Sequence, residues 1–286
     1  MPAPPAIGII GGSGWLGRAI AESLLATGFV PPSSLTLSCR SLHKVAGDLP
    51  GVRWTADNQA VVDGSALVLL CVRPEQFRDV AIDAGGRTLV SVMAGVPLNV
   101  LAARTGTDRI VRAMPNAAAR IRQSYTPWFA SEAVPADARE QVQALFGCCG
   151  VAEQVPSEDQ LDYLSGLAGT GPAFPALLAD AMIRAAVERG IAPDTAHRAA
   201  IGVVAGAAQL LRDTEPADMI QALAEYRGVT AAALEAMRDG GFSELVRRGL
   251  AAAEARAAEM AADFRPESRS NPLQMEPGRA TDGTTP

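Results

Sequence analysis

Residues 7–21 read IGIIGGSGWLGRAIA, and this stretch decides the fold that we expect. A short apolar run at 7–10 breaks into glycines, and a pattern of helical spacing follows with Leu16 and Ile20 on one face. The order strand, glycine turn, helix is that of the first unit of a dinucleotide-binding domain.

Three glycines in this stretch, Gly12, Gly14 and Gly17, have the spacing G-x-G-x-x-G. In a dinucleotide-binding unit the first glycine makes the tight turn, the second admits a pyrophosphate, and the third lets the helix pack on the strand. The free N–H groups of the helix N-terminus then bind phosphate. An ordinary strand–turn–helix connection is the alternative interpretation. The cofactor-binding residues predicted in this loop are Gly12, Ser13, Gly14, Trp15, Leu16 and Gly17.

The composition indicates an ordinary enzyme-sized protein. The chain has 286 residues, enough for two domains, of which 48% are apolar and 20% charged. A net charge of −6 argues against nucleic acid or an acidic membrane surface as the main partner. No apolar run approaches the roughly 18 residues that span a bilayer. The first residues lack a basic region and a cleavage signal, so we expect a cytoplasmic protein.

The cysteines and histidines show no metal-binding spacing. With no export signal, the cysteines are expected to be reduced, and we predict no metal site. Two histidines are also too few for a mechanism that needs several of them. These residues are Cys39, Cys71, Cys148, Cys149, His43 and His197.

Strand-like and helix-like segments alternate through the first half of the chain, which predicts a doubly wound parallel sheet. We therefore expect an α/β domain of Rossmann type at 1–156. The apolar run at 67–72 is typical of a strand buried on both faces. Further strands are predicted at 35–38, 52–54, 88–92, 109–114, 125–130 and 150–155.

The end of the second predicted strand carries basic and hydroxyl side chains. Arg40 and Ser41 stand there, with Lys44 close behind. An acidic residue at this place would accept the 2′-hydroxyl of NAD, whereas guanidinium and hydroxyl groups suit the 2′-phosphate of NADP. We therefore predict NADPH as the preferred cofactor, with Arg40 and Ser41 among its contacts. A solvated basic turn is the alternative.

The second half, from residue 157 to 264, is predicted to be helical because alanine and leucine dominate it. Helices that are apolar all round need burial on every side, and about 100 residues offer too little cover. We therefore expect a homodimer through this domain, or a higher oligomer built from it. Residues 265–286, rich in Pro, Gly, Ser and Thr, predict a disordered tail. The predicted helices lie at 157–166, 173–189, 193–211, 218–225, 230–237 and 242–262.

Several motifs, in order from about residue 6 to residue 262, together resemble the pyrroline-5-carboxylate reductase family. CVRP at 71–74 is similar to A-V-K-P, VSVMAGV at 90–96 to V-S-I-x-A-G-V, RAMPN at 112–116 to R-x-M-P-N, and GTGPAF at 169–174 to G-S-G-P-A-Y. The resemblance implies a Rossmann domain followed by a helical domain that dimerises by interleaving. It also implies cofactor contacts at Asn58, Val72, Arg73, Pro74, Ala94, Gly95 and Asn116.

The resemblance further implies a reaction, the NADPH-dependent reduction of 1-pyrroline-5-carboxylate to L-proline in proline biosynthesis. Hydride passes from a nicotinamide to the C=N carbon of a cyclic imino acid. Because the cofactor supplies the chemistry, few acid or base side chains are needed.

The family's substrate loop, S-P-G-G-T-T, is altered in this chain. The matching segment at 225–230 reads EYRGVT, so only Gly228 and Thr230 agree. The resemblance implies that Thr230 is catalytic, lying near the imine nitrogen, and that Gly228 binds substrate. Glu225 would repel a substrate carboxylate unless it is turned away or neutralised, and Arg227 could neutralise it or bind that carboxylate itself. The alternative is that the loop no longer binds an imino acid.

Thr170 stands in place of a family serine and is a further candidate for substrate binding. Both Thr170 and Asn116 could instead cap helices. Three functions therefore remain open: a reductase of pyrroline-5-carboxylate, a reductase of another imine or oxo acid, and a nucleotide-binding paralogue without turnover.

Overall fold

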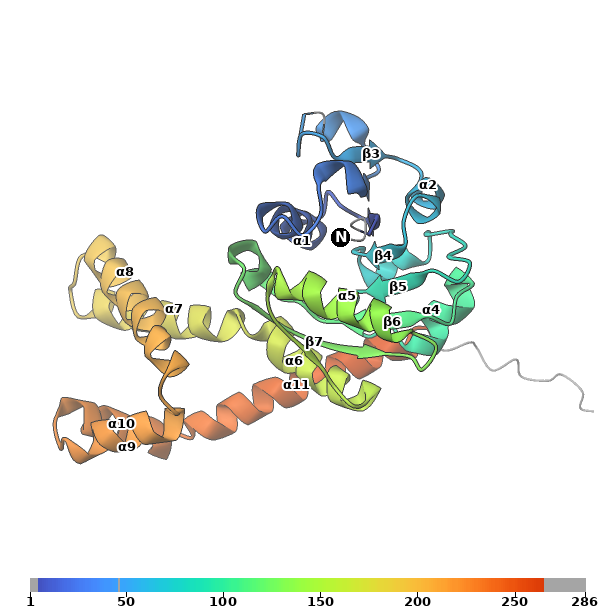
Figure 1. The fold of residues 1–286 in the computed structure, drawn as a ribbon. Coiled ribbons are helices and arrows are strands. Elements are labelled where there is room, and N and C mark those ends of the chain that lie inside the picture. The colour runs from blue at the N-terminus through green and yellow to red at the C-terminus, as the bar shows by residue number, and fades with distance from the viewer. Residues whose placement is uncertain (1–4, 46, 265–286) are drawn as a thin grey trace, which may run out of the picture.

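An eight-stranded sheet occupies the first half of the chain (Figure 1). The structure, a computed structural model, describes residues 5–45 and 47–264, so the tail predicted at 265–286 lies outside the described residues. The strand order is β3-β2-β1-β4-β5-β6-β7-β8. The strands are β1 Ile7–Ile10, β2 Leu35–Ser38, β3 Arg53–Thr55, β4 Leu67–Leu70, β5 Thr88–Ser91, β6 Ile110–Ala113, β7 Ser124–Ala130 and β8 Gly150–Gln154.

The first six strands are parallel, as predicted, but the last two run the other way. β7 pairs antiparallel with β6, and β8 pairs parallel with β7. A parallel return needs a crossover of a dozen or more residues, usually with a helix. The connection at 114–123 holds only the short 3-10 helix η3 (Ala117–Ile121), so β7 returns antiparallel.

Helices cover both faces of the sheet. In β1, Ile7 and Ile9 pack with α1 and α5, whereas Ile10 packs on the opposite face with α2, α3 and α4. Because side chains alternate along a strand, the apolar runs supply both cores, as a doubly wound sheet requires. The helices are α1 Trp15–Ala26, α2 Asn58–Asp63, α3 Pro74–Phe77, α4 Leu98–Thr105 and α5 Ala136–Gly147.

The second half is helical, as predicted, and much of it extends away from the sheet (Figure 1). α6 and α11 pack together beneath the sheet. We call the projecting segment at 173–239, from α7 to α10, the helical arm. The expected domain boundary near residue 156 falls between β8 and α6 and stays a prediction. The helices are α6 Glu158–Thr170, α7 Ala173–Glu188, α8 Pro193–Ile201, α9 Pro216–Glu225, α10 Val229–Asp239 and α11 Phe242–Ala262.

The helix predicted at 193–211 is continuous only in part. α8 ends at Ile201, a π-helical turn follows at Gly202–Gly206, and a 3-10 helix at Ala208–Arg212 completes the segment. Glycines are poor helix formers, and Gly202 and Gly206 bracket the irregular turn.

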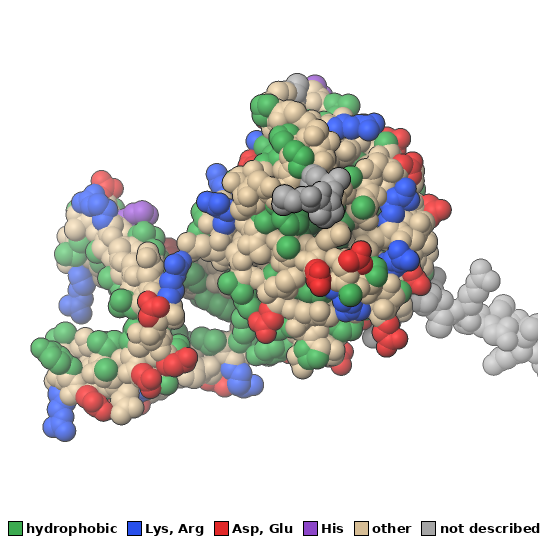
Figure 2. Space-filling model, viewed as in Figure 1, with side chains coloured by type: hydrophobic (Ala, Val, Ile, Leu, Met, Phe, Trp, Pro, Cys, Tyr) green, Lys and Arg blue, Asp and Glu red, His purple; other side chains and the backbone are tan. Residues whose placement is uncertain are grey.

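The helical arm exposes large apolar side chains, as Figure 2 shows. Leu177 is 71% exposed and Leu210 is 60% exposed, and α9, α10 and α11 contain no buried residue among those described. None of the described helices combines the length and apolar character that a membrane crossing requires.

Candidate functional site

A cleft of about 690 Å³ opens at the carboxyl ends of the central strands. β1 pairs with β2 on one side and with β4 on the other, so the cleft lies where the strand order reverses. Ligands of doubly wound sheets bind at such a point. The predicted cofactor residues that line the cleft are Ser13, Gly14, Trp15, Leu16, Arg40, Asn58, Val72, Arg73, Pro74 and Ala94.

The glycine loop forms the centre of the cleft, but the tight turn is made by Gly11 rather than by the predicted Gly12. Gly11 has a φ of +84°, and a Cβ there would lie 2.6 Å from the carbonyl oxygen of Cys71. At Gly12 a Cβ would meet the Leu37 side chain, and at Gly17 the Gly11 carbonyl at 2.7 Å. Gly12 therefore allows the loop to pack against Leu37 of β2, and Gly17 allows α1 to pack against the loop. Neither glycine lines the cleft.

Gly14 is the residue that opens the loop toward a phosphate. It is the N-cap of α1 and lines the cleft. Its backbone and the N-terminus of α1 can therefore approach a pyrophosphate without side-chain obstruction.

The β2 side of the cleft carries polar groups suited to a ribose. The hydroxyl of Ser38 donates to Oδ1 of Asn58 at 2.7 Å and accepts from the Gly11 N–H at 3.3 Å. Arg40 is exposed at the rim, and no hydrogen bond or ion pair between described residues engages its side chain. Asp48, the first acidic residue after β2 in the sequence, pairs with Arg18 at 2.5 Å. The free guanidinium of Arg40 is therefore available to an anion, whereas Ser41 lies outside the lining.

The opposite side of the cleft includes residues that the motifs did not single out. Cys71 and Met93 line it, and each lies inside a motif whose neighbours were predicted as contacts. Burial raises the pKa of the Cys71 thiol, so this thiol stays protonated at neutral pH and is not a nucleophile. Gly95 does not line the cleft, because it packs against α11.

Asn116 and Thr170 make local bonds rather than line the cleft. Oδ1 of Asn116 accepts from the Ala118 N–H at 2.9 Å and so caps η3, which is the capping alternative. The Thr170 hydroxyl donates to the carbonyl of Gly166. It caps no following helix: α6 extends to Thr170, beyond its predicted end, and α7 has no side-chain cap.

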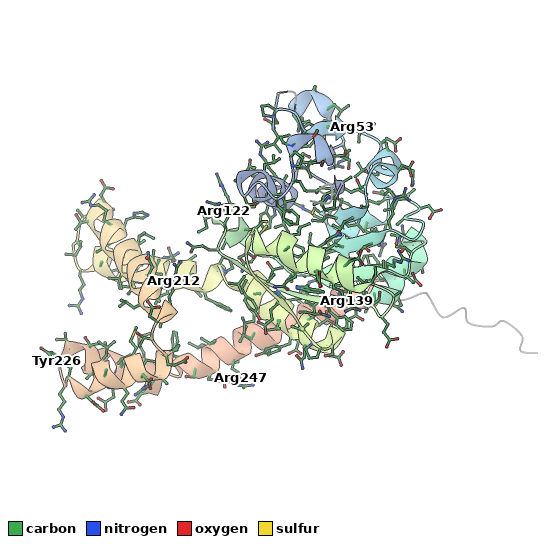
Figure 3. The ribbon with its side chains drawn as sticks, viewed as in Figure 1. Arg53, Arg122, Arg139, Arg212, Tyr226 and Arg247 are labelled. Atoms are coloured by element: carbon green, nitrogen blue, oxygen red, sulfur yellow. The ribbon has the colours of Figure 1, made fainter. Side chains whose placement is uncertain are left out.

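The substrate loop connects α9 to α10 at the end of the helical arm (Figure 3). Gly228 is the N-cap of α10, and Arg227 has a φ of +49°. Tyr226 is 87% exposed. The carboxylate of Glu225 accepts from Nε2 of Gln221 on its own helix at 2.9 Å, so it is turned away from the loop.

Thr230, in the first turn of α10, is also exposed. Within one chain the structure does not bring the substrate loop to the cofactor cleft, because α9 and α10 lie at the far end of the arm from the sheet (Figure 1). The two sets of predicted residues can therefore form one site only if another copy of the chain contributes.

Comparison with known proteins identifies the family. The family model "Pyrroline-5-carboxylate reductase dimerisation" matches residues 158–260, and "NADP oxidoreductase coenzyme F420-dependent" matches residues 6–95. The pyrroline-5-carboxylate reductase of Pseudomonas aeruginosa is 32% identical over 268 residues, 90% of this chain and 97% of that protein. The chain belongs to the pyrroline-5-carboxylate reductase family.

Solved structures of this family have the same fold. The pyrroline-5-carboxylate reductase of Coxiella burnetii matches with a TM-score of 0.82 at 30% identity, covering 90% of this chain and 99% of that one. The enzyme of Streptococcus pyogenes matches with a TM-score of 0.77 at 28% identity, covering 88% and 98%. The resemblance carried by the sequence motifs is therefore confirmed, together with the two-part fold and a pyridine nucleotide as cofactor.

Proposed function

We propose that this protein reduces 1-pyrroline-5-carboxylate to L-proline with NADPH. The observation that carries the proposal is a glycine-lined cleft at the switch point of the sheet, in a chain that aligns with 97% of the Pseudomonas aeruginosa reductase. When bound, the nicotinamide supplies the hydride that reduces the C=N carbon of the imine. The protein binds and orients the two reactants, and the imine nitrogen gains a proton.

The cleft residues accommodate the cofactor in a defined direction. Gly11 makes the tight turn of the loop, Gly14 lines the cleft without a side chain, and the α1 N-terminus binds the pyrophosphate. Asn58 and Ser38 hold the adenosine ribose on the β2 side, and Arg40 binds the 2′-phosphate. This arrangement supports a preference for NADPH over NADH.

Thr230 is the residue that we propose at the reacting centre. A hydroxyl is too weak an acid to protonate the imine unaided, so its role is to orient the nitrogen by a hydrogen bond. The substrate then arrives as an iminium ion or takes its proton from water. Arg227 precedes α10 with no ion pair among the described residues, and it is available to a substrate carboxylate.

The assembly that completes the site is a cytoplasmic homodimer through the helical domain, which we place at 157–264. The dimerisation model matches the region that exposes apolar side chains, including Leu177 and Leu245. Pairing two arms would cover these side chains and carry the substrate loop of one copy to the cleft of the other.

The altered substrate loop favours a second candidate, a reductase of another imine or oxo acid. Glu225, Tyr226, Arg227 and Val229 all differ from the family pattern, while the cofactor cleft is intact. Substrate choice would then change with the same cofactor and the same hydride chemistry.

Oxidation of NADPH with a panel of substrates separates these functions. The panel contains 1-pyrroline-5-carboxylate, its six-membered homologue, 1-pyrroline without the carboxylate, and an oxo acid with ammonia. Greatest kcat/KM on 1-pyrroline-5-carboxylate supports the proposal. Activity only on another substrate supports the second candidate, and binding of NADPH without any turnover contradicts both.

A further inference from the structure

The segment at 92–98, which runs from the end of β5 to the first residue of α4 and which we call loop 92–98, forms one wall of the cofactor cleft. Val92, Met93 and Ala94 line the cleft on the β5 side, while Arg40 and Asn58 line it on the β2 side. Because the adenosine ribose binds at the end of β2 in this fold, the β5 side must receive the nicotinamide half. The position of this loop therefore determines where the reactive ring lies.

The last turns of α11 press directly on this loop. Gly95 is buried with a φ of +70°, and a Cβ there would lie 2.8 Å from Cβ of Met260 and 2.9 Å from the carbonyl oxygen of Ala257. Such distances are below any ordinary contact, so glycine is required for the helix to approach this closely. Gly95 is therefore a docking point for α11.

The residues that follow α11 also contact α3 and the residue after it, next to another wall of the cleft. The rings of Phe264 and Phe77 have centroids 6.5 Å apart, and the guanidinium of Arg78 lies 5.8 Å from the Phe264 ring centroid. Arg78 also donates to the carbonyl of Asp263 at 3.2 Å. Since Pro74 at the start of α3 lines the cleft, one end of α11 supports two adjacent walls.

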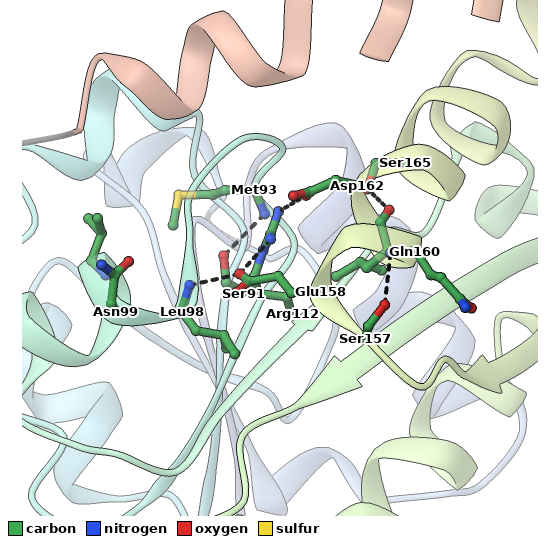
Figure 4. A network of polar contacts seen from close by, with 12 residues as sticks. Ser91, Met93, Leu98, Asn99, Arg112, Ser157, Glu158, Gln160, Asp162 and Ser165 are labelled. Atoms are coloured by element: carbon green, nitrogen blue, oxygen red, sulfur yellow. Dashed lines mark hydrogen bonds and ion pairs between the residues drawn. The ribbon is translucent and has the colours of Figure 1, made fainter. Parts of the chain in front are cut away.

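The far end of the loop is held by α6, through the network of Figure 4, in which Arg112 is buried and its carboxylate partners are partly exposed. Oε1 of Glu158 accepts from the Leu98 N–H at 2.9 Å and from Nη1 of Arg112 at 2.6 Å. Nη2 of Arg112 donates to Asp162 at 2.7 Å, and Arg112 itself is only 2% exposed. A buried guanidinium is costly unless it is paired, so this network holds α6 firmly against the sheet.

We propose that the end of α11, together with Glu158, is a clamp that positions loop 92–98 and thereby fixes the nicotinamide half of the cofactor. Gly95, Phe264 and Glu158 are its positioning residues. α6 and α11 both belong to the helical half, so the clamp couples that half to the cleft. The inference rests on the pyridine nucleotide binding of the proposed function, and not on imine reduction.

The test compares two probes that share the adenosine half, NADPH and adenosine 2′,5′-bisphosphate. Gly95→Ala places a methyl group against α11, which displaces the loop. We expect the Kd for NADPH to rise about tenfold while the Kd for the bisphosphate changes by less than about twofold. Gly28→Ala is the matched control, since Gly28 has a φ of +68° but no atom within 4 Å of its Cβ position. Both Kd values should stay at those of the wild type in this control.

Phe264→Ala provides a second test that leaves the backbone of the loop unchanged. Because Phe264 follows the end of α11, its loss removes the contact with Phe77 without opening the helical domain. We expect the Kd for NADPH to rise about three- to tenfold, again without change for the bisphosphate.

Two results would overturn the clamp. One is that both Gly95→Ala and Phe264→Ala bind NADPH with the affinity of the wild type. If Gly95→Ala does not fold, the same result for Phe264→Ala alone is sufficient. The other is equal weakening of both probes, which indicates general destabilisation. If the wild type binds NADPH but reduces no imine, the proposed reaction is wrong. The Kd values for NADPH and the bisphosphate in the variants still test the clamp in that case.

Discussion

The two halves of the molecule bury their apolar side chains to very different degrees. All residues of β1 and β4 are buried, and helices close over both faces of the sheet. In contrast, α9, α10 and α11 have no buried residue among those described, and Leu177 on α7 is 71% exposed. The sheet half therefore buries its apolar side chains within one chain. The helical arm is as apolar as a protein core, but its side chains stay exposed to solvent.

This difference explains why the candidate site is divided. The predicted cofactor residues lie in the half that buries its own apolar side chains, and the proposed substrate loop lies on the half that leaves them exposed. Burial of one exposed leucine contributes about 1.5–3 kcal/mol, so several of them can stabilise a dimer. Leu177, Leu210 and Leu245, each more than half exposed, are the residues that we expect to contribute most.

The largest effect is expected from breaking the arm interface. Leu177→Asp should yield monomers by light scattering and lower kcat/KM by about a hundredfold or more, because burying an unpaired carboxylate costs several kcal/mol. Val151→Asp on β8 is the matched control, because Val151 is 62% exposed in the sheet half. A dimeric, active Leu177→Asp protein would show that α7 lies outside the interface.

The next effect concerns the arm's contribution to chemistry. Thr230→Ala should lower kcat about 10- to 100-fold on the best substrate while the Kd for NADPH stays unchanged, since a neutral hydroxyl donor is lost from the reacting centre. Thr214→Ala, an exposed threonine elsewhere on the arm, should retain full turnover. Full turnover of Thr230→Ala would mean that the substrate loop has another geometry.

A smaller effect is expected in the sheet half, where Arg40 sets the cofactor preference. A hydrogen bond to a charged group contributes about 1.5–3 kcal/mol, so Arg40→Ala should reduce the preference for NADPH about ten- to a hundredfold and leave NADH use little changed. Arg53→Ala, at an exposed position on β3 (Figure 3), is the control. Equal use of both cofactors by the wild type would refute this prediction.

The smallest effect is a pH dependence confined to the sheet half. Burial raises the pKa of Cys149 from its ordinary value of 9.0 to about 11. The unfolded thiol ionises first, so this stability is complete below pH 9 and is lost as the pH rises toward 11. In urea unfolding, Cys149 should account for a loss of about 1 kcal/mol between pH 7 and pH 10, and the buried thiol of Cys71 should add a loss of the same sign.

The matched pair of variants for that measurement is Cys149→Ala and Cys148→Ala. Cys149→Ala should remove this part of the slope, and Cys148→Ala, whose side chain is only partly buried, should retain it. If the free energy of unfolding falls with pH equally in both variants, groups other than Cys149 cause the loss of stability at alkaline pH.

Local patterns predicted most of the fold because each element carries its own signal. The strand at 35–38 and the helix at 242–262 have the predicted bounds, since apolar runs and helical spacing are local properties. The reversal of β7 depends on the length of a connection. The spacing selects Gly12, whereas the backbone turns at the adjacent Gly11, whose positive φ the spacing does not reveal. Such features required the three-dimensional structure.

Part of the candidate site was also accessible from motifs. Residues 13–16 of the glycine loop, Asn58 and Arg73 line the cleft as expected, whereas Gly12 and Gly17 do not. The pairing of Arg112 with Glu158 and the docking of α11 on Gly95 join residues far apart in the sequence, and no local pattern marks them. The motif around Arg112 drew attention to Asn116, which caps η3 instead.

The central claim is that one active site combines the cleft of one copy with the substrate loop of another. Co-expression of Gly14→Asp, which blocks the cleft, with Thr230→Ala, on differently tagged chains, tests it directly. In the purified heterodimer one of the two composite sites contains neither substitution, so activity should recover to about half of the wild type. If the heterodimer shows only the low activity of the two variants alone, each site is built within a single chain and the claim is contradicted.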